Sequence, residues 1–234
     1  MAIGTPTSIG TASDLSSIGS DPLVITTTST AVVGDEIIVM ITGRGSRSWA
    51  SISDSAGNTY TSMGSDSSGS TNTDTKAQTY RAKVTAQLTS GGTITISNSG
   101  ISAGGTLAEA VMVSGVTNAT DSTGSGKAED VDDLEPTASI TLVASSAIVF
   151  ASVVQETGSA PLFDEAEEWT SLTGVDAAGA TGLAMHTGYR TFDSSGSKTY
   201  APTSGILVEW TCFLGALAEA SASGLDFLPL LGVS

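Results

Sequence analysis

Short apolar runs rich in Val, Ile and Thr recur along this 234-residue chain, and Gly, Ser, Asn and Asp separate them. Residues 93–97 alternate apolar and hydroxyl side chains, as on a strand that buries one face. Residues 37–41 and 147–151 are continuously apolar, which predicts central strands buried on both faces or strands at a subunit contact. Because helical periodicity is scarce, the pattern predicts an all-β fold.

The predicted strands form two sets. The first set comprises 23–33, 36–42, 49–53, 59–63, 77–85, 92–97 and 107–113. The second set comprises 137–143, 147–154, 168–172, 181–190, 198–200 and 206–214. Three segments of the first set recur in the second, in the same order and 109 or 110 positions later: 60–63 with 169–172, 80–81 with 189–190, and the apolar runs beginning at Ile37 and Ala147. These matches predict an internal duplication.

Two related halves can form tandem sandwiches or two packed halves of one sandwich. Each half offers only short strands, and residues 115–135 have the composition of a loop rather than of a long linker. We therefore favour a jelly-roll or immunoglobulin-like β-sandwich built from two related halves, with extended N- and C-terminal arms. The predicted organisation is an N-terminal arm at 1–22, a first half at 23–116, an acidic connecting loop at 117–136, a second half at 137–218 and an apolar tail at 219–234.

The apolar tail is too short to form a core alone. It is expected to pack back on the sandwich or to dock on a neighbouring subunit, as terminal arms do in shells and tubes. The residues expected to make assembly contacts are Leu225, Phe227, Leu228, Leu230 and Leu231. Residues 64–76 are predicted to form an exposed loop of Ser, Gly, Thr and Asp.

Charge narrows the range of partners. The formal net charge is -16, from 24 acidic and 8 basic residues. Binding to a phosphate backbone or to an anionic membrane needs Lys and Arg, so both are excluded. Residues 1–6 lack the basic and apolar regions of a signal peptide, and no apolar run approaches the ~20 residues that span a bilayer. We therefore expect synthesis in the cytoplasm and, for a role outside the cell, exit by assembly into a phage particle.

Candidate catalytic residues are few. The single cysteine, Cys212, lies in an apolar run and is predicted to be a buried thiol. The single histidine, His186, excludes a two-histidine metal site and lies in a strand pattern, where it is predicted to have a structural role. The string 124–127 resembles part of a phosphate-binding loop but lacks its first glycine and its closing Ser or Thr, so it is predicted to be an ordinary loop.

Carboxylates cluster between residues 129 and 135. Calcium takes several oxygen ligands, so this loop is a weak candidate for a cation site, while a solvated acidic loop is the favoured interpretation. The candidate ligands are Asp130, Asp132, Asp133 and Glu135. The acidic turns 54–58 and 164–168 carry the same two alternatives. No cofactor is predicted, and glycoside hydrolysis by a carboxylate pair stays open because the separation of such a pair is spatial.

Trp49 is the best candidate for a sugar-binding platform, because it follows a loop that holds two arginines. A position in the core is the favoured interpretation of this residue.

Two stretches, 33–39 and 53–60, resemble a β-sandwich module found in phage structural proteins and bacterial surface proteins. Residues 79–82 and 92–96 fit the order of that module, and the resemblance covers roughly 23–116. It implies a jelly-roll or immunoglobulin-like sandwich used in virion assembly or surface display.

Three functions follow as hypotheses. The first is a non-enzymatic virion structural protein, most of all a capsid decoration (cement) protein that binds a capsid lattice as a homo-oligomer. The second is a tail, fibre or spike component that binds a carbohydrate or receptor through Trp49. The third and weakest is a hydrolase that uses loop carboxylates such as Asp132 and Asp133. The expected location is the virion, with capsid or tail proteins as partners.

Overall fold

The computed structural model describes residues 2–14, 22–44, 48–68, 75–99, 105–128, 136–156, 163–164, 166, 168–177, 182–204 and 209–221. Every regular element in these residues is a β-strand, which confirms the all-β prediction. The first half contains β1 (Thr7–Asp14), β2 (Leu23–Thr26), β3 (Glu36–Arg44), β4 (Ser48–Asp54), β5 (Thr61–Ser67), β6 (Thr75–Lys83), β7 (Thr93–Ser99) and β8 (Thr106–Val113). The second half contains β9 (Val116–Ala128), β10 (Ala138–Leu142), β11 (Ala147–Glu156), β12 (Phe163–Asp164), β13 (Thr170–Ser171), β14 (Val175–Ala177), β15 (Leu183–Phe192), β16 (Gly196–Tyr200), β17 (Thr203–Ser204) and β18 (Trp210–Glu219). No helix that could cross a membrane occurs in this part of the chain.

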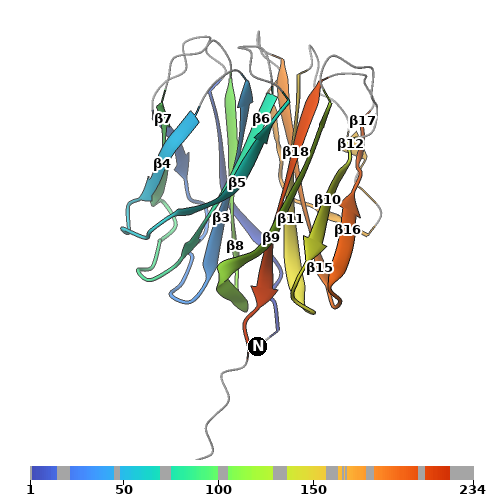
Figure 1. Ribbon diagram of the computed structural model, residues 1–234. Helices are drawn as coiled ribbons and strands as arrows, with labels where there is room; N and C mark the ends of the chain where they lie inside the picture. The colour runs from blue at the N-terminus through green and yellow to red at the C-terminus, as the bar shows by residue number, and fades with distance from the viewer. Residues whose placement is uncertain are drawn as a thin grey trace, which may run out of the picture.

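The strands form antiparallel sheets arranged as successive layers (Figure 1). A three-stranded sheet, β2-β7-β4, covers a five-stranded sheet, β1-β8-β3-β6-β5. The opposite face of the five-stranded sheet packs on an eight-stranded sheet, β13-β15-β11-β18-β9-β10-β16, in which β14 also pairs with β15. The end of this sheet formed by β10 and β16 curls back over its own centre, and β12 and β17 form a separate pair.

Three hydrophobic cores lie between these layers. The first-half core lies between the three- and five-stranded sheets and includes Ile25, Ile41, Trp49, Ile94 and Ile96. The seam lies between the five- and eight-stranded sheets and includes Ile38, Met40, Phe150, Phe213 and Leu217. The second-half core lies inside the curl and includes Ile140, Val149, Trp169, Tyr200 and Trp210. Because the seam is a continuous apolar core, the two halves pack closely rather than as separate beads.

The two continuously apolar runs are central strands buried on both faces, as predicted. In β3, Ile38 points into the seam and Val39 into the first-half core. In β11, Ile148 points into the seam and Val149 into the second-half core. Each such side chain stabilises the fold by roughly 1.5–3 kcal/mol when it is fully buried.

The two halves share one strand order. Rank here means the order of a strand along its half, counted without the short strands β14 and β17 of the second half. By this count, β9-β18-β11-β15-β13 has the same order as β1-β8-β3-β6-β5, and β10-β16 matches β2-β7. Some of the contacts across the seam are also reciprocal. Strand β11 contacts β6 as β15 contacts β3, and β5 contacts β9 and β18 as β14, the strand after β13, contacts β1 and β8. Such reciprocity is the property of an isologous, two-fold interface.

The sequence matches between the halves can be checked against the face that each residue occupies. Tyr60 packs against the first-half core and Trp169 lies in the second-half core, while Met63 and Leu172 both contact the seam. The match of 60–63 with 169–172 therefore agrees with the fold in the face that each residue occupies, as does the match of the apolar runs in β3 and β11.

The match of Tyr80 with Tyr189 is wrong by one position. Tyr80 lies in the first-half core, whereas Tyr189 packs against the seam, on the opposite face of its sheet. The equivalent of Tyr80 is Arg190, because Tyr80 pairs with Val39 and Arg190 pairs with Val149. A shift of one residue along a strand moves every side chain to the other face.

Each predicted strand overlaps an observed one, and the corrections concern segments rich in Ser, Thr and Gly. Part of the predicted N-terminal arm is β1, which pairs with β8 and buries Ile9. Most of the predicted connecting loop is β9, and the predicted loop 64–76 is shortened by β5 and β6. Strands β1, β9, β12, β14 and β17 were not predicted.

The string 124–127 lies in β9 and shapes the curl of the sheet. A Cβ atom on Gly124 would stand 2.0 Å from the carbonyl oxygen of Ser139, and one on Gly126 would stand 1.9 Å from that of Thr137. Only glycine at these two positions of β9 lets the backbone of residues 137–139, at the start of β10, approach this closely. These glycines therefore turn β10 over the second-half core.

Candidate functional sites

Glu36 is a fully buried carboxylate on β3 whose partner extends to the second half. Arg81 Nη1 lies 3.3 Å from Glu36 Oε1 and donates to Asn118 Oδ1 at 2.5 Å, while Arg81 Nε donates to the Thr120 hydroxyl at 3.2 Å. Burial raises the pKa of Glu36, and the charge and hydrogen bond of Arg81 offset only part of this effect. Arg81 therefore links β3 and β6 to β9.

Glu109 is a second fully buried carboxylate, on β8, and it also reaches across the seam. Its Oε1 accepts a hydrogen bond from the Thr173 amide at 3.2 Å. Its Oε2 accepts from the Gly174 amide at 3.0 Å and from the Thr187 hydroxyl. The carboxylate of the first half thus fixes the connection between β13 and β14 and the face of β15.

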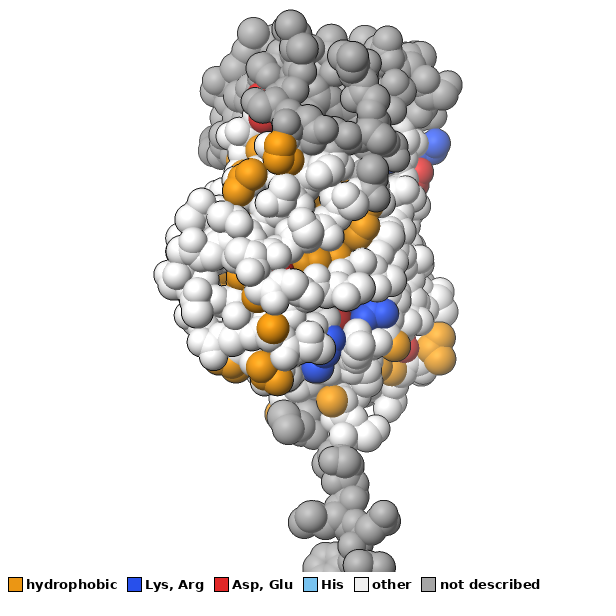
Figure 2. Space-filling model, turned by 90° about the vertical axis from the view of Figure 1, so that its left-hand side faces the viewer, with side chains coloured by type: hydrophobic (Ala, Val, Ile, Leu, Met, Phe, Trp, Pro, Cys, Tyr) orange, Lys and Arg blue, Asp and Glu red, His pale blue; other side chains and the backbone are white. Residues whose placement is uncertain are grey.

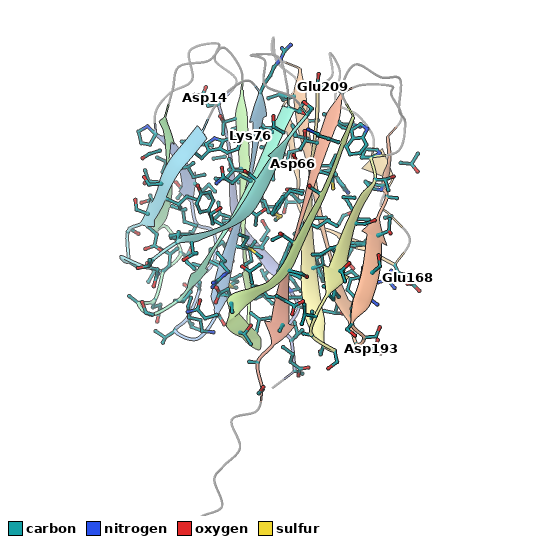
Figure 3. The ribbon with its side chains drawn as sticks, in the orientation of Figure 1. Asp14, Asp66, Lys76, Glu168, Asp193 and Glu209 are labelled. Carbon is teal, nitrogen blue, oxygen red and sulfur yellow. The ribbon has the colours of Figure 1, made fainter. Side chains whose placement is uncertain are left out.

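Glu209, labelled at one end of the seam in Figure 3, is the centre of a third cluster. Its Oε1 accepts from the Ser68 hydroxyl and from the Thr75 amide, the latter at 2.9 Å. The Thr75 and Thr211 hydroxyls lie 2.7 Å apart. Here a carboxylate of the second half binds donors of the first, so Glu109 and Glu209 link the halves directly and Glu36 does so through Arg81.

Asp54 organises the acidic turn 54–58. Its Oδ1 accepts from the amides of Ala56, Gly57 and Asn58, at 2.9, 2.7 and 3.0 Å. Its Oδ2 accepts from the Asn58 side-chain amide at 2.9 Å and from the Tyr60 hydroxyl at 3.0 Å. Burial, followed by the charge of Asp54, raises the pKa of Tyr60. Both carboxylate oxygens are occupied by protein donors, so this turn is a structural one.

The described residues contain no group of three or more His, Cys, Asp or Glu that could hold a metal ion. The predicted cation ligands Asp130, Asp132, Asp133 and Glu135 lie outside the described residues, and the turn 164–168 is described only in part. The tail residues Leu225, Phe227, Leu228, Leu230 and Leu231 also lie outside them.

Trp49 lies in the first-half core and is 2% exposed. Tyr80 donates to its carbonyl oxygen at 2.6 Å, and Lys76 Nζ lies 5.5 Å from the centroid of its ring. Stacking on a sugar needs an open aromatic face, and this ring offers none. The structure supports the interpretation of Trp49 as a core residue, and the alternative prediction of a sugar-binding platform at Trp49 is wrong.

The single cysteine and the single histidine both lie within strands of the eight-stranded sheet. Cys212 is fully buried in the second-half core, as predicted, and burial raises the pKa of its thiol. His186 lies on β15 opposite Val153 and is half-buried.

The outermost faces of the layered body carry rows of hydroxyl groups. The first outer face, on the three-stranded sheet, consists of Val24, Thr26, Ser51, Ser53, Thr93, Thr95 and Ser97, which alternate with core residues. The second outer face, on β10 and β16, includes Ser139, Thr141, Ser197 and Thr199, all exposed. Viewed from the side of the three-stranded sheet, most of the surface is neither apolar nor charged (Figure 2). The alternation in 93–97 was the sequence signal for the first of these faces.

Comparisons with protein-family models, with characterised proteins and with solved structures found no match to this chain.

Proposed function

We propose that the chain is a non-enzymatic structural protein of a virion, and specifically a capsid decoration (cement) protein that binds a capsid lattice as a homo-oligomer. A tail, fibre or spike component is the alternative within this class. The observation that carries the proposal is the seam, where a continuous apolar core and three glutamate-centred clusters join two like halves into one body.

The use made of two buried and two half-buried carboxylates supports a scaffold role. Glu109 and Glu209 bind donors of the other half, Glu36 binds Arg81, which reaches the other half, and Asp54 closes a turn. A general acid or base needs a carboxylate that can exchange a proton with a substrate. In these four positions the carboxylate binds protein donors that hold the backbone and neighbouring side chains in place, and the second oxygen of Glu36 is buried without a partner.

We further propose that the halves arose by duplication of one sandwich-forming unit, so that the chain is a fused pseudo-dimer of jelly-roll or immunoglobulin-like sandwiches. The shared strand order, the reciprocal contacts across the seam and the equal placement of Ile38 and Ile148 support this origin. Both types of sandwich, jelly-roll and immunoglobulin-like, are compatible with this origin.

The function is tested on virions. Particles purified by density gradient from cultures that produce the chain should contain it in a copy number comparable to that of the major capsid protein, measured by quantitative mass spectrometry. Particles grown without the gene should lose heat resistance and recover it when the purified chain is added back.

Two results would change the conclusion. A few copies per particle would favour the tail, fibre or spike alternative. Absence of the chain from purified particles would refute a virion role.

A further inference from the structure

Strand β4 is an open edge. Ser51 and Ser53 face β7, whereas the amide and carbonyl of Ile52 point to the other side, where no described residue bonds them. An unpaired strand edge presents a row of amide and carbonyl groups that can pair with another strand. The remaining backbone groups of this edge are less available, because Tyr80 bonds the Trp49 carbonyl and Gly57 bonds the Asp54 carbonyl.

The other described edges are covered or protected. Strand β5 contacts β9, and β1 contacts β2 and β14, so both edges of the five-stranded sheet lie against other strands. Strand β16 carries Lys198, a charge of the kind that protects an edge from pairing. Strands β13 and β14 are two and three residues long.

Strand β4 has no covering strand and no charged side chain of this kind, and a bulge between Trp49 and Ser51 confines its regular edge to the residues that follow. It contains no Pro, Lys, Arg or Glu, and its single acid, Asp54, is occupied by the donors of its own turn. The first outer face, beside this edge, likewise carries no charge and exposes 43% of Val24. On a chain of net charge -16, this is a place where a second copy can approach without facing like charges.

We infer that β4 is the self-association site of the chain, where β4 of one copy pairs antiparallel with β4 of a second copy across a two-fold axis. The inference rests on the homo-oligomer of the proposed function and names its surface. A strand edge is complementary to itself under two-fold rotation, so the two three-stranded sheets join into one continuous sheet. In the described part of the second half, the strand at the matching rank, β12, is two residues long and is already paired with β17. One open edge per chain gives a closed dimer rather than a filament.

The test uses the full chain in solution. Light scattering coupled to size-exclusion chromatography should give twice the 23.3 kDa mass of one chain for the wild type. The double variant S51D/S53D places four carboxylates beside the two-fold axis and should give the mass of one chain at the same concentration. Both serines are exposed, so the fold of the subunit is retained, which circular dichroism checks.

The matched control is S139D/T141D, which adds the same two charges at exposed positions of β10, a strand paired on both sides. It should remain a dimer. Hydrogen exchange supplies a second measurement, because the amide of Ile52, which faces the open edge, should exchange more slowly as the protein concentration rises.

A wild-type chain with the mass of one subunit at every concentration would overturn the inference, as would a control that dissociates equally or exchange in β4 that ignores concentration. The outcome is distinct from that of the virion test. A monomer that is abundant in particles refutes this site and the homo-oligomer but leaves the virion role, and a β4-linked dimer that is absent from particles refutes the virion role alone.

Discussion

Replacing Glu109 by Gln tests whether the seam makes the two halves one folding unit. The carboxylate is fully buried and binds three donors, the amides of Thr173 and Gly174 and the hydroxyl of Thr187. A glutamine has the same shape, but one of its two terminal atoms is a donor rather than an acceptor. At least one of the three donors must therefore lose its partner.

The size of the effect follows from these bonds. A hydrogen bond to a charged group contributes about 1.5–3 kcal/mol, and a buried donor left without a partner costs about 1–3 kcal/mol. Removing a buried charge returns part of its desolvation cost, which acts in the opposite direction. We expect Glu109→Gln to lower the free energy of unfolding by about 1–3 kcal/mol.

Urea unfolding followed by tryptophan fluorescence measures this loss separately in each half. Trp49 lies in the first-half core, whereas Trp169 and Trp210 lie in the second-half core. The variant W169F/W210F thus reports on the first half, and W49F reports on the second. Glu109→Gln should lower the midpoint of both reporters by the same amount, because the seam couples the two cores.

The control is Glu168→Gln, which makes the same chemical change at an exposed glutamate on the second half (Figure 3). Its surface pair with Arg190 should contribute no more than about 1 kcal/mol. The reasoning is refuted by a Glu109→Gln effect as small as that of the control. Separate midpoints for the two reporters would refute the single folding unit.

Three further predictions follow from single contacts. Because burial raises the pKa of Glu36, its contribution to stability is fully present below its ordinary pKa of 4.5 and is lost as pH rises through the folded value. Urea midpoints between about pH 4 and pH 8 should therefore fall more steeply with rising pH in the wild type than in Glu36→Gln, and parallel curves would contradict the assignment. Gly124→Ala places a methyl group 2.0 Å from the Ser139 carbonyl and should destabilise the chain by at least about 2 kcal/mol in thermal unfolding, while Ser125→Ala should have little effect. Cys212, fully buried with a raised thiol pKa, should react with a thiol-specific reagent only at the rate of unfolding, and rapid labelling of the folded chain would show that the second-half core is open.

The apolar strands could be predicted from the sequence because a run of consecutive apolar residues by itself indicates burial on both faces. The runs beginning at Ile37 and Ala147 need no distant information, since a strand without polar side chains has no face to offer to water. Strands β1 and β9 were missed for the opposite reason. Their Ser, Thr and Gly residues are typical of loops, and only pairing with β8 and β18 makes them strands.

The links across the seam could be predicted only in part. Glu36 begins the apolar strand β3, and Glu109 interrupts the apolar strand β8. An acid in such a position indicates a buried carboxylate with a partner. The identity of the partner had no local signal, because Glu109 and Thr187 are 78 positions apart. The one-residue error at Tyr189 has the same origin, since only the pairing of β11 with β15 shows which face that residue occupies.

The position of the last strand has a consequence for how the chain folds during synthesis. Strand β18 lies between β9 and β11, so the centre of the eight-stranded sheet is completed by a segment that leaves the ribosome after the other described strands. Until then, β9 and β11 each expose an unpaired edge, and the seam lacks Phe213 and Leu217 while the second-half core lacks Trp210 and Leu214. Pairing across such long stretches of sequence is slow. A nascent chain that stalls before Trp210 therefore presents the same open edges to other chains, and translation through β18 is the step that ends its exposure to aggregation.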